Sequence, residues 1–123
     1  MSQILLVEDE KNIILATKMC LEGAGYDVLV VKDGLTAIDT AFNYKPDLIL
    51  LDILIPKMNG YLVCEALRQD ERTKKLPIVM LSAKAEEEDI KKAMKLGAND
   101  YLVKPFEPKE LLSKIKDNIE ALN

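Results

Sequence analysis

The sequence contains no histidine and no tryptophan among its 123 residues. Without an imidazole, this chain cannot by itself build a serine or cysteine triad, a histidine zinc site or a phosphohistidine. It has only two cysteines, Cys20 and Cys64, too far apart for a zinc knuckle or a C-x-x-C redox pair. We expect both to be reduced, buried thiols in helices. Carboxylates, lysines and hydroxyls must therefore carry any chemistry.

Long apolar runs and an excess of positive charge are also absent. No segment approaches the ~20 apolar residues of a membrane-spanning helix, and the segment MSQILLVEDE does not have the layout of a signal peptide. Seventeen basic side chains stand against 21 acidic ones, for a net charge of −4. Phosphate contacts need clustered positive charge, so a general nucleic-acid surface is disfavoured. These features predict a cytoplasmic, soluble protein that binds neither membrane nor nucleic acid directly.

The composition, 49% hydrophobic and 31% charged, is typical of one globular domain, which we assign to residues 1–123. Short apolar runs alternate with longer amphipathic segments, and the runs are Ile4–Val7, Val28–Val31, Leu48–Leu51, Ile78–Leu81 and Tyr101–Val103. Continuous hydrophobicity is typical of strands buried on both faces of a parallel sheet. We therefore predict a doubly wound α/β fold with a five-stranded parallel sheet, order 2-1-3-4-5, and five helices.

Polar side chains follow the apolar runs. Glu8 and Asp9 come directly after the first run, Asp52 after the third, Ser82 after the fourth and Lys104 after the fifth. Ligands of such sheets bind at the carboxyl ends of the strands, where the strand order reverses between the first and third strands. We therefore expect three carboxylates to converge there, with a hydroxyl and an ammonium beside them.

These residue types predict phosphoryl transfer to an aspartate. Mutually repelling carboxylates are relieved by a hard divalent cation such as Mg²⁺. A carboxylate oxygen can also act as a nucleophile and form an aspartyl phosphate. Lys104 would neutralise phosphoryl oxygens, and the Ser82 hydroxyl would donate a hydrogen bond to one of them.

Each residue also has a purely structural alternative. Asp9 could cap the following helix, Ser82 could cap a turn, and Lys104 could be an ordinary solvated lysine. Asp52 is harder to explain in this way. It ends an apolar strand and is followed by Ile53–Pro56, so its burial is costly without compensation.

Four segments carry a resemblance to a known family: ILLVEDE, PDLILLDILIPKMNG, PIVMLSAK and GANDYLVKPFEP. Together and in this order they resemble the receiver domain of two-component response regulators, over essentially the whole chain. The resemblance implies a flavodoxin-like fold and a phosphorelay signalling switch. Such a domain is no turnover enzyme and only assists its own phosphorylation and dephosphorylation.

The resemblance also implies individual roles. They are Asp52 as phosphoacceptor, Asp9, Asp52 and the Leu54 carbonyl as Mg²⁺ ligands with Glu8 acting through water, Lys104 and Ser82 as catalytic partners, Ser82 and Tyr101 as switch residues, Ala83 as the small residue that admits phosphate donors, and Pro105 as the residue after a cis peptide bond. Two departures from the pattern are modest: the acidic pair is Glu-Asp, and Ile55 replaces a common methionine. A structural alternative for Tyr101 is a buried ring with its hydroxyl in water.

The implied phosphate donor is a sensor histidine kinase or a phosphotransfer protein, because this chain has no histidine. In the first helix one stripe is expected to face inward, namely Ile13, Ala16, Thr17, Cys20 and Leu21. Leu15 points almost opposite to it. We hypothesise that Leu15, with Ile14 and Met19, forms part of a kinase-docking patch; the alternative is a singly exposed leucine.

On the output side, the resemblance implies that the fourth helix, fifth strand and fifth helix form the surface that responds to phosphorylation and meets a partner or a second copy. The apolar stripe of the fifth helix consists of Leu111, Leu112, Ile115, Ile119 and Leu122. No output domain is expected within residues 1–123. Both a stand-alone receiver and a piece of a longer regulator are consistent with this.

The sequence fits three other functions less well. An aspartate-nucleophile, Mg²⁺-dependent phosphohydrolase needs Asp-x-Asp after the first strand, whereas Asp9 is followed by Glu10 and Lys11. A flavodoxin-type flavin carrier needs a phosphate loop rich in Ser, Thr and Gly, where acids would repel the phosphate. A degenerate receiver is disfavoured because the acidic, hydroxyl and lysine positions are all present.

Overall fold

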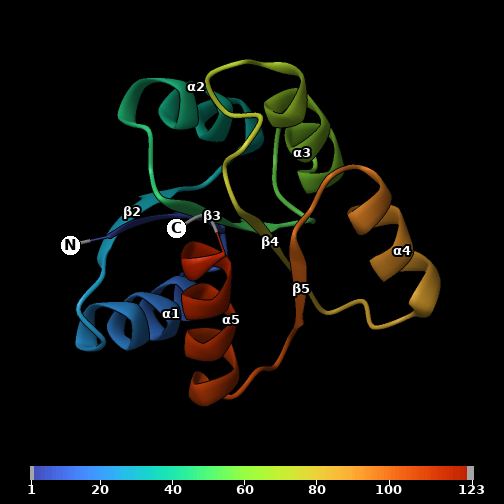
Figure 1. Cartoon of the computed structure of the whole chain (residues 1–123). Coiled ribbons are helices and arrows are strands. Elements are labelled where there is room, and N and C mark those ends of the chain that lie inside the picture. Colours follow the sequence, from blue (N-terminus) through green and yellow to red (C-terminus); the bar gives the residue numbers. More distant parts are fainter. Residues whose placement is uncertain (1, 122–123) are drawn as a thin grey trace.

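The computed structural model describes residues 2–121, in which five strands alternate with five helices (Figure 1). The elements are β1 (Gln3–Val7), α1 (Lys11–Gly23), β2 (Asp27–Val31), α2 (Gly34–Tyr44), β3 (Leu48–Asp52), α3 (Gly60–Gln69), β4 (Ile78–Ser82), α4 (Glu87–Lys95), β5 (Asp100–Val103) and α5 (Pro108–Glu120). All strand pairs are parallel, and their order is β2-β1-β3-β4-β5. The predicted fold is confirmed.

Two hydrophobic clusters fill the space between the sheet and its helices. Alternate strand residues point to opposite faces, so that Leu6 and Leu50 lie in one cluster and Leu5 and Leu51 in the other. Helices α1 and α5 cover the first face, and α2, α3 and α4 cover the second (Figure 1). No helix among residues 2–121 is long and apolar enough to cross a bilayer.

Some local expectations need correction. The expected burial of every strand on both faces is wrong for β2, where Asp27 is exposed and Val28–Val30 are half-buried, because β2 is an edge strand. Both cysteines are free and lie in helices, but only Cys64 is buried; Cys20 is half-buried. In α5, Leu111 and Ile115 are buried, whereas Leu122 lies outside the described residues.

The start of α1 is capped by Glu10 rather than by Asp9. The Glu10 carboxylate accepts hydrogen bonds from the amides of Asn12 (3.3 Å) and Ile13 (2.8 Å). These amides have no intrahelical acceptor, so a side-chain oxygen satisfies them. The capping alternative for Asp9 is therefore wrong, and its carboxylate is left exposed at the carboxyl end of β1.

Candidate functional site

The acidic residues that follow β1 and β3 meet at the carboxyl edge of the sheet. One carboxylate oxygen from each of Glu8, Asp9 and Asp52 lies within 4.8 Å of the others. Neighbouring parallel strands bring them together, since Val7 pairs with Leu51 in the residues just before. Glu8 and Asp52 are buried and Asp9 is exposed. Such a set of oxygens fits the ligand preference of Mg²⁺.

Lys104 reaches this acidic cluster from the end of β5. Its Nζ donates to Glu8 Oε1 at 2.7 Å and to Asp52 Oδ2 at 3.1 Å. The lysine side chain is only 16% exposed, so the alternative of a solvated surface lysine is wrong. The ammonium places a positive charge against the two buried carboxylates and compensates part of their desolvation.

The charges of this cluster alter its proton affinities. Burial and the neighbouring Glu8 carboxylate raise the pKa of Asp52 to about 6, although Lys104 acts in the opposite direction. Burial by itself would lower the pKa of Lys104, but the hydrogen bond to Glu8 and the charge of Asp52 outweigh it and raise that pKa. The site therefore favours a charged lysine beside an aspartate that takes up a proton unusually easily.

Ser82 lies at the end of β4 and is buried. Its Oγ accepts a hydrogen bond from the Lys84 amide at 3.1 Å, so the turn-capping role weighed for this residue is present. A hydroxyl group that accepts one bond can still donate its proton. This role therefore leaves Ser82 able to donate toward a ligand.

Tyr101 lies in β5 with its ring buried. Its hydroxyl donates to the Lys84 carbonyl at 3.0 Å. The alternative of a hydroxyl left in water is therefore wrong. Tyr101 thus connects β5 to the segment that leads from Ser82 to α4. Because the acceptor is a backbone carbonyl, which every residue carries, the sequence could not predict this hydrogen bond.

A groove of about 460 Å³ opens beside the acidic cluster, between α1 and the segment after β5. It is lined by Asn12, Ile13, Ala16, Thr17, Ala83, Lys104, Pro105 and Phe106. Ala83 is exposed, and the Lys104–Pro105 peptide bond is cis. The predicted access residue and the predicted active-site lysine therefore share one concave surface.

Helix α1 flanks this groove. Leu15 is 59% exposed and Met19 65% exposed, while Ile14 is half-buried. The inward stripe is only partly buried: Thr17 and Leu21 are buried, but Ala16 is exposed. Ala16 lines the open groove, so no neighbouring element covers it.

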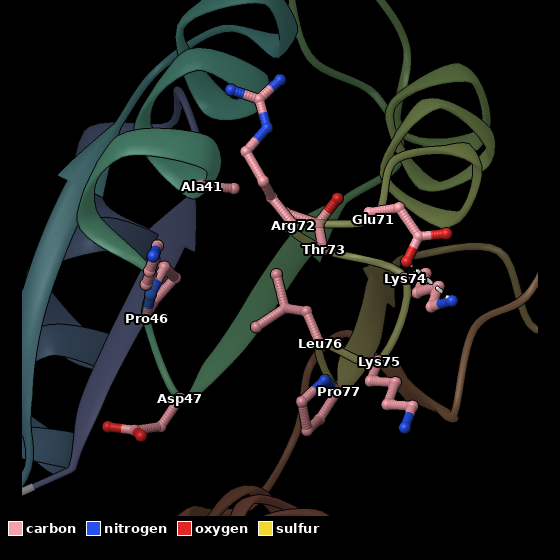
Figure 2. A pocket seen from close by; sticks show the side chains of 11 residues that line it. Ala41, Pro46, Asp47, Glu71, Arg72, Thr73, Lys74, Lys75, Leu76 and Pro77 are labelled. Carbon is pink, nitrogen blue, oxygen red and sulfur yellow. Dashed lines mark ion pairs between the residues drawn. The ribbon is translucent and has the colours of Figure 1, made fainter.

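A second pocket, of about 400 Å³, lies at the opposite, amino edge of the sheet (Figure 2). It lies between the α2–β3 and α3–β4 connections, and Leu76 and Pro77 form part of its wall. On its rim Arg72 pairs with Asp70 and Lys74 pairs with Glu71, and further charges come from Lys45, Asp47 and Lys75. None of the predicted site residues lines it.

Sequence reasoning missed the pairing of Glu8 with Lys104. The Glu8 carboxylate also accepts hydrogen bonds from the amides of Asp9 and Glu10, both at 3.1 Å. It is therefore the anchor of the lysine as well as a member of the acidic cluster. The available signal was a lysine and a glutamate that both follow apolar strands of one parallel sheet and so share an edge.

The chain matches the family model described as the response regulator receiver domain over residues 4–116. Among curated proteins, it is 45% identical over 114 residues to the alkaline phosphatase synthesis transcriptional regulatory protein PhoP of Bacillus subtilis, covering 93% of this chain and 47% of that protein. It is 40% identical to the DNA-binding response regulator MtrA of Mycobacterium leprae, covering 93% of this chain and 49% of that protein. The chain thus spans about half the length of these relatives.

Solved structures match over nearly their whole length. A response regulator from Chloroflexus aurantiacus superposes with a TM-score of 0.93 at 36% identity, covering 97% of this chain and 98% of that one. The receiver domain of the sensor histidine kinase PA1611 from Pseudomonas aeruginosa gives a TM-score of 0.91 at 34% identity, with coverage of 97% and 98%. That structure has a magnesium ion coordinated in its active-site cleft.

Proposed function

This chain belongs to the response regulator receiver domain family, and on that basis we propose that it is a phosphorelay switch whose phosphoacceptor is Asp52. The single observation that carries the proposal is the contact of Lys104 with both Glu8 and Asp52 inside an acidic cluster. A site that forms an aspartyl phosphate needs a carboxylate nucleophile and positive charge for the phosphoryl oxygens. Asp52 supplies the carboxylate, Lys104 supplies the charge, and Glu8 and Asp9 lie beside them.

In the proposed reaction, an oxygen of Asp52 attacks the phosphorus of a phosphohistidine on a partner protein. An O–P bond forms and the N–P bond breaks, and the electron pair of that bond remains on the imidazole nitrogen. Lys104 neutralises developing negative charge on the phosphoryl oxygens. The Ser82 hydroxyl, which keeps a proton to donate, hydrogen-bonds one of them.

Mg²⁺ is the proposed cofactor, held by Asp9, Asp52 and the Leu54 carbonyl, with Glu8 acting through water. The fit rests on the carboxylate oxygens of Glu8, Asp9 and Asp52, which lie within 4.8 Å of one another. When bound, the ion supplies positive charge that offsets carboxylate and phosphoryl repulsion. The magnesium ion in the related PA1611 receiver supports this assignment.

The donor is proposed to dock on α1 and the adjoining groove. Leu15 and Met19 supply exposed apolar surface on α1, Ile14 adds a half-buried side chain, and Ile13 and Ala16 of the same helix line the groove. Thr17, which lines it, has a buried hydroxyl without a hydrogen-bond partner among residues 2–121.

The proposed output surface consists of α4, β5 and α5, with Ser82 and Tyr101 as the switch residues. Tyr101 holds the segment after Ser82 through Lys84, so a change at Ser82 reaches α4 through that segment. A partner protein, a second copy or an output domain would read this surface. Relatives of twice this length that are DNA-binding regulators support an output that acts on DNA.

Intact mass measured after incubation with acetyl phosphate and Mg²⁺ tests the proposal. One added phosphoryl group is expected, and both Asp52→Asn and EDTA should abolish it. The matched control Asp117→Asn, an exposed aspartate in α5, should label like the wild type. Labelling that survives Asp52→Asn would contradict the assignment, and turnover of an external phosphoester would instead favour a phosphohydrolase.

A further inference from the structure

Helix α4 is held by few apolar side chains. Ala93 is its one buried residue, Ile90 is half-buried and Met94 is 43% exposed. Elements with little buried apolar surface open locally at low free-energy cost. The position of α4 on the proposed output surface therefore depends strongly on its polar contacts.

The neighbouring helix α3 supplies such contacts from one face. Tyr61, Cys64 and Arg68 are spaced by three and four residues and so lie on one stripe of α3. Each donates to a backbone carbonyl in or directly after α4: the Tyr61 hydroxyl to Asp89 (3.5 Å), the Cys64 thiol to Leu96 (3.6 Å) and Arg68 Nε to Gly97 (2.8 Å). We call these three α3 residues the α3 rail.

Leu96 is the C-cap of α4. The last carbonyls of a helix have no intrahelical donors, so a side chain such as Cys64 can satisfy that of Leu96. Arg68 is the strongest member because its charged, planar group also donates to the Thr73 carbonyl (3.3 Å) and to Asn99 Oδ1 (2.7 Å).

Gly97 makes this close contact with Arg68 feasible. Its φ of +111° lies in the left-handed region, and a Cβ there would lie 2.6 Å from Arg68 Cγ. The turn after α4 thus packs directly on the aliphatic part of the Arg68 side chain. Any residue other than glycine at position 97 would displace that side chain.

At the other end of the rail, Lys92 of α4 lies over the Tyr61 ring, with Nζ 4.4 Å from the ring centre. The hydroxyl-to-carbonyl distance of Tyr61 is long for a hydrogen bond, and the cation–π contact adds a second interaction between Tyr61 and α4. Tyr61 therefore contacts α4 at Asp89 and Lys92, while Arg68 contacts the turn that follows the helix.

Helix α3 also begins against the proposed phosphoacceptor. The Gly60 amide donates to the Ile53 carbonyl at 2.8 Å, and a Cβ on Gly60 would lie 2.7 Å from the Asp52 carbonyl oxygen. We propose that the α3 rail positions α4 relative to Asp52 and forms a second connection between them, separate from Ser82 and Tyr101. This inference rests on the proposed phosphorelay function.

Amide hydrogen exchange of the full chain tests the rail. Arg68→Met removes the three Arg68 hydrogen bonds, and Lys92→Met removes only the surface cation over Tyr61. Arg72→Met is the control for Arg68→Met, because Arg72 contacts Asp70 and Phe42 rather than α4. Lys95→Met is the control for Lys92→Met, because Lys95 lies on α4 but it is Lys92 that lies over the Tyr61 ring. We expect α4 amides to exchange at least about fivefold faster in Arg68→Met and about twofold faster in Lys92→Met, with β1 and β3 much less affected.

The same measurement after acetyl phosphate treatment tests the connection to Asp52. Phosphorylation should change the exchange rates of the α4 amides in the wild type. In Arg68→Met, the rates before and after phosphorylation should differ by no more than about twofold. Unchanged α4 exchange in both variants, or an equal acceleration across β1 and β3, would overturn the rail. Failure of the wild type to label at Asp52 would contradict the proposed function, whereas exchange in unlabelled protein would still decide whether the rail holds α4.

Discussion

Asp52 ends a fully buried strand, and its side chain is almost entirely removed from water. Its neighbours act in opposite directions: the Glu8 carboxylate disfavours the ionised form, while the Lys104 ammonium favours it. Burial is the largest effect, and together with Glu8 it outweighs Lys104 and raises the pKa of Asp52 from 3.8 to about 6. With this pKa the carboxylate is mostly ionised at neutral pH, as the proposed role of Asp52 as nucleophile requires, but burying its charge lowers the stability of the fold.

Because of this cost, we expect Asp52→Asn to stabilise the fold by an amount that depends on pH. The folded chain binds the Asp52 proton more tightly than the unfolded chain. The stability that this proton binding contributes is therefore fully present below about pH 4 and is lost as the pH rises through about 6. Without Mg²⁺ at pH 7.5, Asp52→Asn should unfold with a free energy larger by about 1–3 kcal/mol. The gain should shrink steadily toward pH 4.

Urea unfolding of both proteins between pH 4 and pH 8 measures this difference. The exposed variant Asp117→Asn serves as the control and should show no such pH-dependent gain. A difference that is constant over this range, or larger at the acidic end, would contradict the electrostatic account of Asp52.

At the scale of elements, glycines decide how closely helices approach loops. The first residue of α2, Gly34, donates its amide to the Pro56 carbonyl at 3.1 Å. A Cβ on Gly34 would overlap the Met58 carbonyl oxygen and lie 2.9 Å from Val63 Cγ2. Helix α2 therefore packs directly on the loop that follows Asp52.

Gly34→Ala should destabilise the protein by about 1–3 kcal/mol, because backbone atoms of a packed loop have to move. Gly23→Ala provides the comparison, since Gly23 ends α1 and nothing lies within 4 Å of an added Cβ. That variant should be neutral or more stable by up to about 1 kcal/mol, because alanine favours helix. Thermal or urea unfolding measures both changes; equal effects of the two variants would refute the packing argument.

At the scale of the whole molecule, α1 flanks the groove beside the acidic cluster, and the proposed output surface consists of α4, β5 and α5. Leu15 and Met19 are exposed on α1, where the donor is proposed to dock. Under this proposal a protein donor contacts that surface, whereas a small phosphodonor needs only access to Asp52.

Leu15→Glu should therefore slow transfer from a phosphorylated kinase at least about tenfold, because a charge in an apolar contact costs more than 1 kcal/mol. Labelling by acetyl phosphate should be unchanged. Leu35→Glu is the matched control, since Leu35 is 52% exposed on α2, away from the groove. Equal loss with both donors, or no loss with the kinase, would refute the docking hypothesis.

The order and type of the elements could be predicted from the sequence because hydrophobic periodicity is a local property. The meeting of Glu8, Asp9 and Asp52 followed as well, since the carboxyl ends of parallel strands share one edge. The partial exposure of β2 could not be read from Val28–Val31, because an edge position depends on strand order rather than on residue type.

By itself, then, the sequence determined the parallel sheet and the residues that stand at its carboxyl edge. Only the tertiary structure decided that Lys104 bonds to both Glu8 and Asp52, that Tyr101 donates to the Lys84 carbonyl, and that Arg68 holds the end of α4. The physical reason is that these contacts join segments far apart in the chain, and several of their acceptors are backbone carbonyls. Every residue carries such a carbonyl, so only the packing of the elements selects which one is used.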